Sequence, residues 1–412
     1  MTNVTTVALA RCEHYDLARV EEAVRHTVAL LGGMSAFVHE GQRVLLKPNL
    51  CRPMAPATAV TTHPAVVRAV AILVREAGAT PIIAESPGGA FSRRILQRLY
   101  EKTGMTRVAQ ETGAQLNYDV RSLQVNHPGA KLLHALDIIQ VATEVDAIVS
   151  LPKLKTHNLT RITGATKNLF GLIPGVTKIA YHHKLQDAER FSTGLIDILT
   201  YASPVLTLMD GIVAMHGNGP SGGDPFPMGT VIASSNAVAV DVVAAYLVGF
   251  EPRTIEPVRI AIQQGLCSER VGDMTIRGGS LEDMRVQGFR PGTATVMDPG
   301  LLPRGLLRIL APLLMARRVK GTESETLSVS ALPPALRRWV TRQMVPTPVA
   351  GPKCTGCGFC AEDCPVDAIT ITDHHAYMDP RQCIRCYCCH ELCPHLAVEL
   401  KRPWIGRLLF GE

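Results

Sequence analysis

Nine of the twelve cysteines in this chain lie between Cys354 and Cys393, and their spacing repeats. The two runs are Cys354-x2-Cys357-x2-Cys360-x3-Cys364-Pro365 and Cys383-x2-Cys386-x2-Cys389-x3-Cys393-Pro394. Three closely spaced thiolates can hold three iron corners of a cubane, and one more distant thiolate completes the four. The repeat therefore predicts two [4Fe–4S] clusters.

Each run is similar to the bacterial ferredoxin motif, in which the fourth cysteine of one run ligates the cluster of the other. This resemblance implies one cluster on Cys354, Cys357, Cys360 and Cys393, and a second on Cys383, Cys386, Cys389 and Cys364. Structural zinc sites are the alternative, but their cysteine pairs are normally separated by longer loops. Cys388 is an extra cysteine, which we expect to be a small buried residue, with a role as alternative ligand left open.

Thiolate-ligated cubanes are low-potential centres, and cysteines used in this way belong to a reducing compartment. The N-terminus has no basic region followed by an apolar run, so a secretory signal is not expected. The best membrane-span candidate, residues 228–250, carries Asp241 near its middle and three polar residues in its first half. We expect a cytoplasmic protein that works under anaerobic conditions.

A second set of chemically capable residues lies far from the cysteines. These residues are lysines, histidines, asparagines and threonines in short motifs that follow apolar runs. The predicted substrate-binding residues are Lys47, Asn49, Lys153, Lys155, Thr156, Thr163 and Asn168, and the predicted catalytic residues are Lys167, His157 and His63. Lysine ammonium groups, together with the accessible backbone amides of glycine-rich loops, suit a carboxylate or a phosphate. Solvated loop lysines are the alternative interpretation.

The elements that would position these residues alternate between strands and helices. Strands are predicted at residues 4–10, 43–47, 81–85, 146–151, 205–209 and 231–233, and helices at 17–31, 63–77, 92–102 and 237–248. This alternation predicts an α/β fold: a mainly parallel layered sheet with helices on both faces, plus a small α+β ferredoxin-like domain with two clusters. Ligands of such sheets bind beyond the carboxyl ends of the strands, where the polar motifs fall.

Two lookalike motifs do not support nucleotide binding. Gly217-x-Gly219-x-x-Gly222 has the letters of a dinucleotide fingerprint, but prolines at and after position 220 forbid the helix that must follow. Residues 164–167 lack the spacing of a phosphate-binding loop. The basic excess is also local, because eight basic and two acidic residues between 300 and 345 account for the net charge of +6. With no known recognition motif, we expect no nucleic-acid partner.

Through these motifs, the chain resembles the domain of unknown function 362 family with a C-terminal ferredoxin module. The matching residues are 45–49, 62–64, 151–157 and 163–168, together with Gly171, Pro174-Gly175, Asp210-Gly211 and Asp241. A weaker resemblance, in residues 164–175, is to the catalytic half of nickel-dependent lactate racemases. It implies a similar fold, but the run from Asn168 to Gly171 departs from the racemase pattern, so we do not expect racemase chemistry.

The predicted domains are an α/β domain at 1–297, a basic linker at 298–350, the cluster domain at 351–401 and a tail at 402–412. Within the linker, residues 301–318 contain Pro303 and Pro312, so we expect one broken basic amphipathic helix or two short ones. We expect its leucine face to pack on a neighbouring domain rather than to lie on a membrane surface.

Two functional hypotheses follow. The first is a reductase that takes electrons from a soluble donor of ferredoxin or flavodoxin type and delivers them to a small anionic organic substrate or cofactor. The second is a non-catalytic electron-transfer subunit or a partner-docking, sensing iron–sulfur protein.

Overall fold

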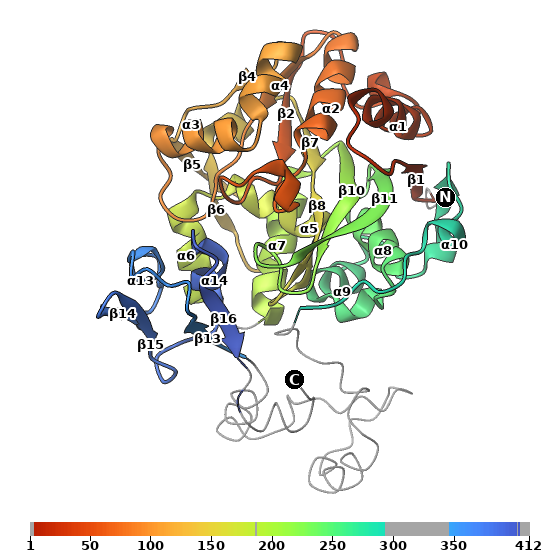
Figure 1. Ribbon diagram of the computed structural model, residues 1–412. Coiled ribbons are helices and arrows are strands. Elements are labelled where there is room, and N and C mark those ends of the chain that lie inside the picture. Colours follow the sequence, from red (N-terminus) through yellow and green to blue (C-terminus); the bar gives the residue numbers. More distant parts are fainter. Residues whose placement is uncertain (1–3, 186–187, 293–345, 402, 404–412) are drawn as a thin grey trace, which may run out of the picture.

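The computed structural model describes residues 4–185, 188–292, 346–401 and 403. A large α/β module carries most of them, and a small cysteine-rich module follows (Figure 1). The predicted linker helix at 301–318 and most of the tail lie outside the described residues. None of the helices in the described part of the chain is long and apolar enough to cross a bilayer.

The core of the large module is one twisted sheet. Its strands run in the order β12 (Thr275–Arg277), β1 (Thr6–Arg11), β11 (Asp224–Ser234), β10 (Leu206–His216), β7 (Ala147–Leu151), β2 (Arg43–Pro48), β3 (Thr80–Ile83) and β4 (Gln115–Leu116). Strands β10, β7, β2, β3 and β4 are parallel to one another, whereas β11 is antiparallel to β10 and β1. The carboxyl ends of the parallel strands therefore meet at one edge.

Two hydrophobic cores cover the two faces of this sheet. One face packs against α1 (Leu17–Ala29), α2 (Pro64–Glu76), α3 (Arg93–Lys102) and α4 (Met105–Thr112). The other packs against α5 (Ala165–Asn168), α7 (Ala188–Ala202), α8 (Ala237–Leu247) and α9 (Glu256–Gln263). The predicted layered α/β fold with helices on both faces is confirmed.

The remaining elements of the large module are peripheral or short. They are the hairpin of β5 (Ser122–Asn126) with β6 (Ala135–Ile139), and the helices α6 (Gly175–Lys184) and α10 (Leu281–Met284). Strand β10 turns back into β11 through residues 217–223, so a strand follows the glycine-rich stretch where a dinucleotide fold would need a helix. The rejection of that fingerprint is confirmed.

Local chemistry explains where the helices begin. Ser92 caps α3 by accepting a hydrogen bond from the amide of Ile95, and Asn236 caps α8 in the same way. The cap of α2 is His63, whose ring nitrogen accepts from the amide of Ala65 at 3.2 Å. Thr61 and Thr62, which precede this cap, are both fully buried.

Strands β7 and β8 (Lys153–His157) are joined only by Pro152, and both run parallel to β10. β8 thus continues beyond the sheet edge and is covered by β9 (Arg161–Thr163). The sequence predicts a loop for this run, and that prediction is wrong. The residues of β8 are completely or almost completely buried.

The small module has two short helices, α13 (Phe359–Glu362) and α14 (Cys388–Leu392), and two antiparallel strand pairs. Strand β14 (Ile369–Thr372) pairs with β15 (His375–Met378), and β13 (Thr347–Ala350) pairs with β16 (Val398–Lys401). Because β13 is part of this module, the module includes residues that the sequence prediction, with its boundary at 351, places in the linker.

Candidate functional site

The eight motif cysteines line two separate chambers of the small module. Cys354, Cys357, Cys360 and Cys393 line the first chamber. Cys364, Cys383, Cys386 and Cys389 line the second. In each chamber, three cysteines come from one run and the fourth comes from the other, which is the grouping that the ferredoxin resemblance implies.

The chemistry of these chambers fits iron–sulfur clusters better than single metal ions. Backbone amides donate hydrogen bonds to three of the sulfurs: Ala368 to Cys364, Ala397 to Cys393 and Arg385 to Cys383, at 3.2–3.4 Å. Such bonds stabilise ligated thiolates and tune cluster potentials. Within the described ranges, no three His, Cys, Asp or Glu side chains converge closely enough to hold one metal ion.

Three lysines at the carboxyl edge of the large sheet are buried to 1% exposure or less: Lys47, Lys153 and Lys155. Lys153 and Lys155 alternate on β8 with His157, so all three project from the same face of that strand. Burial of this degree shows that they are structural charges and not solvated loop lysines. Each must therefore find partners inside the protein.

Lys47, at the end of β2, is paired with Glu85, which follows β3. Its Nζ lies 2.8 Å from Glu85 Oε2, and the same oxygen accepts the amide of Leu50 at 2.9 Å. A side chain at position 171 would collide with this pair, because a Cβ there would lie 2.2 Å from Glu85 Oε1 and 2.4 Å from Lys47 Nζ. This close approach accounts for Gly171 in the sequence motif.

Lys153 is engaged in a second buried network, which also holds His63. Its Nζ donates to Asp210 at 2.9 Å and to the Tyr15 hydroxyl at 2.6 Å. The His63 ring stacks on Tyr15, and burial lowers the His63 pKa to about 4. These residues fix the start of α2 against β10. Neither His63 nor Lys153 lines the cavity described below.

His157 is fully buried at the end of β8, and its proton is placed by its surroundings. Its Nδ1 accepts hydrogen bonds from the amides of Leu159 and Thr160 at 3.0 and 3.1 Å. The neutral ring therefore carries its hydrogen on Nε2, which lies 2.9 Å from Glu391 Oε1 of the small module. Thr156 points elsewhere and binds the carbonyl of Gly217.

The small module docks on this edge through α14. Arg52, just beyond β2, donates to the carbonyl oxygens of Glu391 and Cys393 at 2.8 and 2.6 Å. These contacts satisfy carbonyls at the end of α14, which intrahelical bonds leave free. His390 adds a contact of 3.4 Å from its Nε2 to the carbonyl of Asn218. Cys393, which lines the first cluster chamber, is thus hydrogen-bonded through its carbonyl oxygen to Arg52 at the edge of the large sheet.

A cavity of about 90 Å³ lies between the two modules and is hereafter called the interface cavity. Its wall comes from β2, β3, β9, α5 and α6 with their loops, and from α14. The lining residues include Asn49, Cys51, Glu85, Ser86, Thr163, Lys167, Asn168, Lys178, Cys388 and Glu391. Cys388 also lines the second cluster chamber, so this residue is shared by the walls of the interface cavity and of that chamber.

Several buried polar atoms of the interface cavity have no partner in the protein. They are Ser86 Oγ, Thr163 Oγ1 and Asn168 Oδ1, on residues exposed by 3% or less. The orientation of the Asn168 amide is fixed, because its Nδ2 donates to the Lys47 carbonyl at 2.9 Å and to Ser150 at 3.0 Å. Unpartnered polar atoms of this kind are rare in native interiors, so these three are open to a bound ligand or an ordered water.

Two lysines give the interface cavity a positive character. Among the described residues, Lys167 Nζ has no hydrogen-bond or ion-pair partner, although the side chain is largely buried. Lys178 on α6 contacts the Ser86 carbonyl, and burial lowers its pKa to about 8. Glu85 is neutralised by Lys47, so Glu391 is the remaining acidic group of the wall. The balance favours an anion.

Asp241 on α8 positions the turn that carries Lys167. Its carboxylate accepts from the amides of Ala165 and Thr166 and from the Thr166 hydroxyl, at 2.6–2.8 Å. Burial raises the pKa of Asp241 to about 6 despite these bonds. A Cβ at position 164 would lie 1.9 Å from this carboxylate, so only glycine fits there.

The structure thus divides the candidate site residues into two groups. Asn49, Thr163, Lys167 and Asn168 line the interface cavity. Lys47 and Lys155 do not line the cavity but form hydrogen bonds with residues that do. His157 contacts Glu391 of the cavity wall. The other three predicted residues, His63, Lys153 and Thr156, do not line the cavity. Sequence reasoning missed Cys51, Ser86, Lys178 and Glu391. Only Lys178 carried a signal, because it follows the Pro174-Gly175 motif closely.

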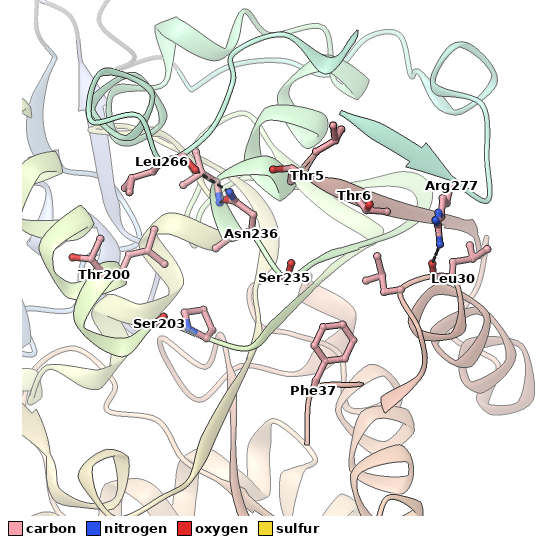
Figure 2. Close-up of a pocket in the computed structure, with 16 residues that line it drawn as sticks. Thr5, Thr6, Leu30, Phe37, Thr200, Ser203, Ser235, Asn236, Leu266 and Arg277 are labelled. Atoms are coloured by element: carbon pink, nitrogen blue, oxygen red, sulfur yellow. Dashed lines mark hydrogen bonds between the residues drawn. The ribbon is translucent and has the colours of Figure 1, made fainter. Parts of the chain in front are cut away.

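A much larger hollow, of about 720 Å³, lies at the opposite edge of the sheet, where β1 and β10 begin (Figure 2). Its largest polar side chains, Asn236 and Arg277, are already used in the fold. Asn236 donates to the Leu266 carbonyl at 2.9 Å, and Arg277 donates to the Leu30 carbonyl at 2.8 Å. We therefore place the functional site at the interface cavity despite its smaller size.

Fold and site together define an α/β protein with an appended ferredoxin-type iron–sulfur module. Residues 44–246 match the model for domain of unknown function DUF362, and residues 353–397 match a 4Fe-4S dicluster domain. A thylakoid-associated protein of Synechocystis sp. is 34% identical over 270 residues, which are 64% of this chain and 80% of that protein. The chain belongs to the DUF362 family.

Two further similarities are more limited. One subunit of an ion-translocating oxidoreductase complex of Methanosarcina acetivorans is 40% identical over 48 residues, which are 12% of this chain and 18% of that subunit. The lactate racemase apoprotein of Thermoanaerobacterium thermosaccharolyticum shares 16% identity, with a TM-score of 0.33 over 57% of this chain and 55% of the racemase. This second similarity is too low to support a functional comparison.

Proposed function

We propose that this protein is an iron–sulfur oxidoreductase that delivers electrons to a small anionic organic molecule bound in the interface cavity. Two [4Fe–4S] clusters would supply the single electrons. The observation that carries the proposal is the cavity wall, because Cys388 of the second cluster chamber lines the same cavity as the free Lys167 ammonium and three unpartnered polar atoms.

The residues of the wall have distinct roles in this proposal. Lys167 and Lys178 bind the carboxylate of the ligand, and the hydroxyls of Ser86 and Thr163 donate hydrogen bonds to it. Asn168 Oδ1 can only accept, so it selects a ligand that also offers a hydrogen-bond donor. Cys388, with Leu392 of the same helix, keeps bulk water from the second chamber.

The proton-transfer role that the sequence suggests for His157 is indirect in this arrangement. His157 is separated from the cavity by Glu391, so any proton that it provides must pass through that carboxylate. Lys178 is the more direct proton donor. With a pKa of about 8, its ammonium group is mostly protonated near neutral pH and can still release its proton to a bound ligand. A cytoplasmic location and a soluble ferredoxin- or flavodoxin-type donor remain part of the proposal.

Anoxic reoxidation of the reduced protein tests the proposal. Reduced protein freed of excess dithionite would be mixed with pyruvate, glyoxylate, acrylate or fumarate while the visible cluster absorption is followed. We expect at least one of these carboxylates to reoxidise the clusters. Lys167→Ala should slow that reaction about tenfold to a hundredfold, because a charge-assisted hydrogen bond is lost.

Lys102→Ala is the matched control, because Lys102 is an exposed lysine at the end of α3, away from the cavity. Its clusters should reoxidise at the wild-type rate. If no carboxylate reoxidises intact clusters, the non-catalytic electron-transfer or docking alternative is favoured. If Lys167→Ala reacts like Lys102→Ala, the anion role of Lys167 is wrong.

A further inference from the structure

Lys155 differs from the other two buried lysines in what its ammonium group faces. Lys47 and Lys153 each face a carboxylate, at 2.8 and 2.9 Å. Lys155 Nζ instead lies 2.8 Å from Asn49 Oδ1, 2.7 Å from the Val60 carbonyl and 3.6 Å from Cys51 Sγ. Among the described residues, no carboxylate oxygen comes within 4.0 Å of it.

A fully buried ammonium group is costly unless an anion compensates it. Burial lowers the pKa of Lys155, and Cys51 is the nearest group that raises it again. Glu391 acts in the same direction from farther away, and Lys167 opposes it. The thiol of Cys51 is thus the one contact of Lys155 Nζ that can become an anion.

Cys51 also has access to a ligand. It is half-buried and lines the interface cavity together with Ser86, Thr163 and Asn168, whose unpartnered polar atoms point to a bound molecule. The cysteines of the cluster motifs lie in the two chambers instead. A thiol within 3.6 Å of a lysine Nζ, at the wall of a ligand cavity, is the arrangement of a nucleophilic cysteine.

We propose that Cys51, paired with the Lys155 ammonium, is a nucleophile that bonds to the carbonyl carbon of a small oxo-carboxylate in the interface cavity. One C–S bond forms from the thiolate lone pair, the C=O π pair moves to oxygen, and that oxygen takes one proton from water. No electron enters or leaves. The new hydroxyl can donate to Asn168 Oδ1. This inference rests on the proposed function for the identity of the site.

Alkylation of the anoxic cluster-loaded protein tests the inference with two matched reagents, iodoacetate and iodoacetamide. In both, sulfur bonds to the CH₂ carbon and iodide leaves, but only iodoacetate carries a carboxylate. Rates at each cysteine would be followed by peptide mass spectrometry. Cys267 is the internal control, since it is also half-buried and burial raises its pKa to about 11. We expect Cys51 to react at least about tenfold faster than Cys267.

We also expect Cys51, relative to Cys267, to prefer iodoacetate. Lys167→Ala should remove this preference, whereas Lys155→Met should slow both reagents. The wild-type comparison does not depend on any variant folding. Cys51 reacting no faster than Cys267, or labelling at Cys388 instead, would overturn the nucleophile. Fast labelling without a preference would support the Lys155–Cys51 pair and contradict the anion site of the proposed function.

Discussion

His157 is neutral at physiological pH because its ring is fully buried next to Lys167, and these surroundings lower its pKa to about 4. In the unfolded chain the pKa of a histidine is near 6.5. The unfolded state therefore binds more protons than the folded state once the pH falls below that value. The stability that His157 contributes is present above pH 6.5 and is lost as the pH falls toward 4.

Replacing His157 by asparagine should flatten this pH dependence. Asparagine can still accept the amides of Leu159 and Thr160, so the turn is retained. Between pH 7.5 and 5.5 the wild type should lose about 1 kcal/mol more unfolding free energy than the variant. In thermal denaturation under anoxic conditions this difference corresponds to about 1–2 °C. His14→Asn, at an exposed position, should behave like the wild type. Equal pH dependence in all three proteins would contradict the assignment.

At the scale of elements, the layered sheet is well predicted from the sequence because its strands are apolar and its helices have clear ends. The prediction fails at β8, because in Lys153-Leu154-Lys155-Thr156-His157 only Leu154 is apolar, so the run resembles an exposed loop. Burial of its lysines depends on Asp210 and Asn49, which are distant in sequence. The same long-range pairing explains why only part of the candidate site converges, since Lys153 is already bound to Asp210.

Arg52 should control how firmly α14 is held against the large module. Arg52→Met would leave the carbonyls of Glu391 and Cys393 without their donor, at a cost of about 2–3 kcal/mol. We expect amide hydrogen exchange in residues 388–392 to accelerate about tenfold to a hundredfold, with β1 and β2 unaffected. Arg94→Met, at an exposed position of α3, is the control. Unchanged exchange in α14 would show that other contacts suffice for docking.

Across the whole molecule, the two cysteine runs depend on each other, because each cluster chamber takes its fourth cysteine from the other run. Sequence spacing identifies all eight cysteines, and the chambers group them as the ferredoxin resemblance implies. The docking of this module on the large sheet has no sequence signature. It depends on Arg52, on the His157–Glu391 contact and on backbone carbonyls, which form no recognisable pattern in the sequence.

Paired substitutions should show that each cluster takes cysteines from both runs. Cys364→Ser and Cys383→Ser alter different runs but the same chamber, so the double variant should lose about half of the iron and sulfide, no more than either single variant. Cys360→Ser with Cys383→Ser alters both chambers and should lose nearly all of it. Iron and sulfide analysis with EPR of the reduced protein measures both outcomes. Near-complete loss in the first pair would mean that each run holds its own cluster.

The pairing of β13 with β16 brings Thr347 opposite Lys401, so the cysteine-rich module begins and ends on adjacent strands. A segment whose ends meet in space can be gained or lost by gene fusion without disturbing the fold of its host. For protein engineers, the same geometry suits this module for insertion into another protein. A new host surface must then supply hydrogen-bond donors to the carbonyl oxygens at the end of α14, as Arg52 does here.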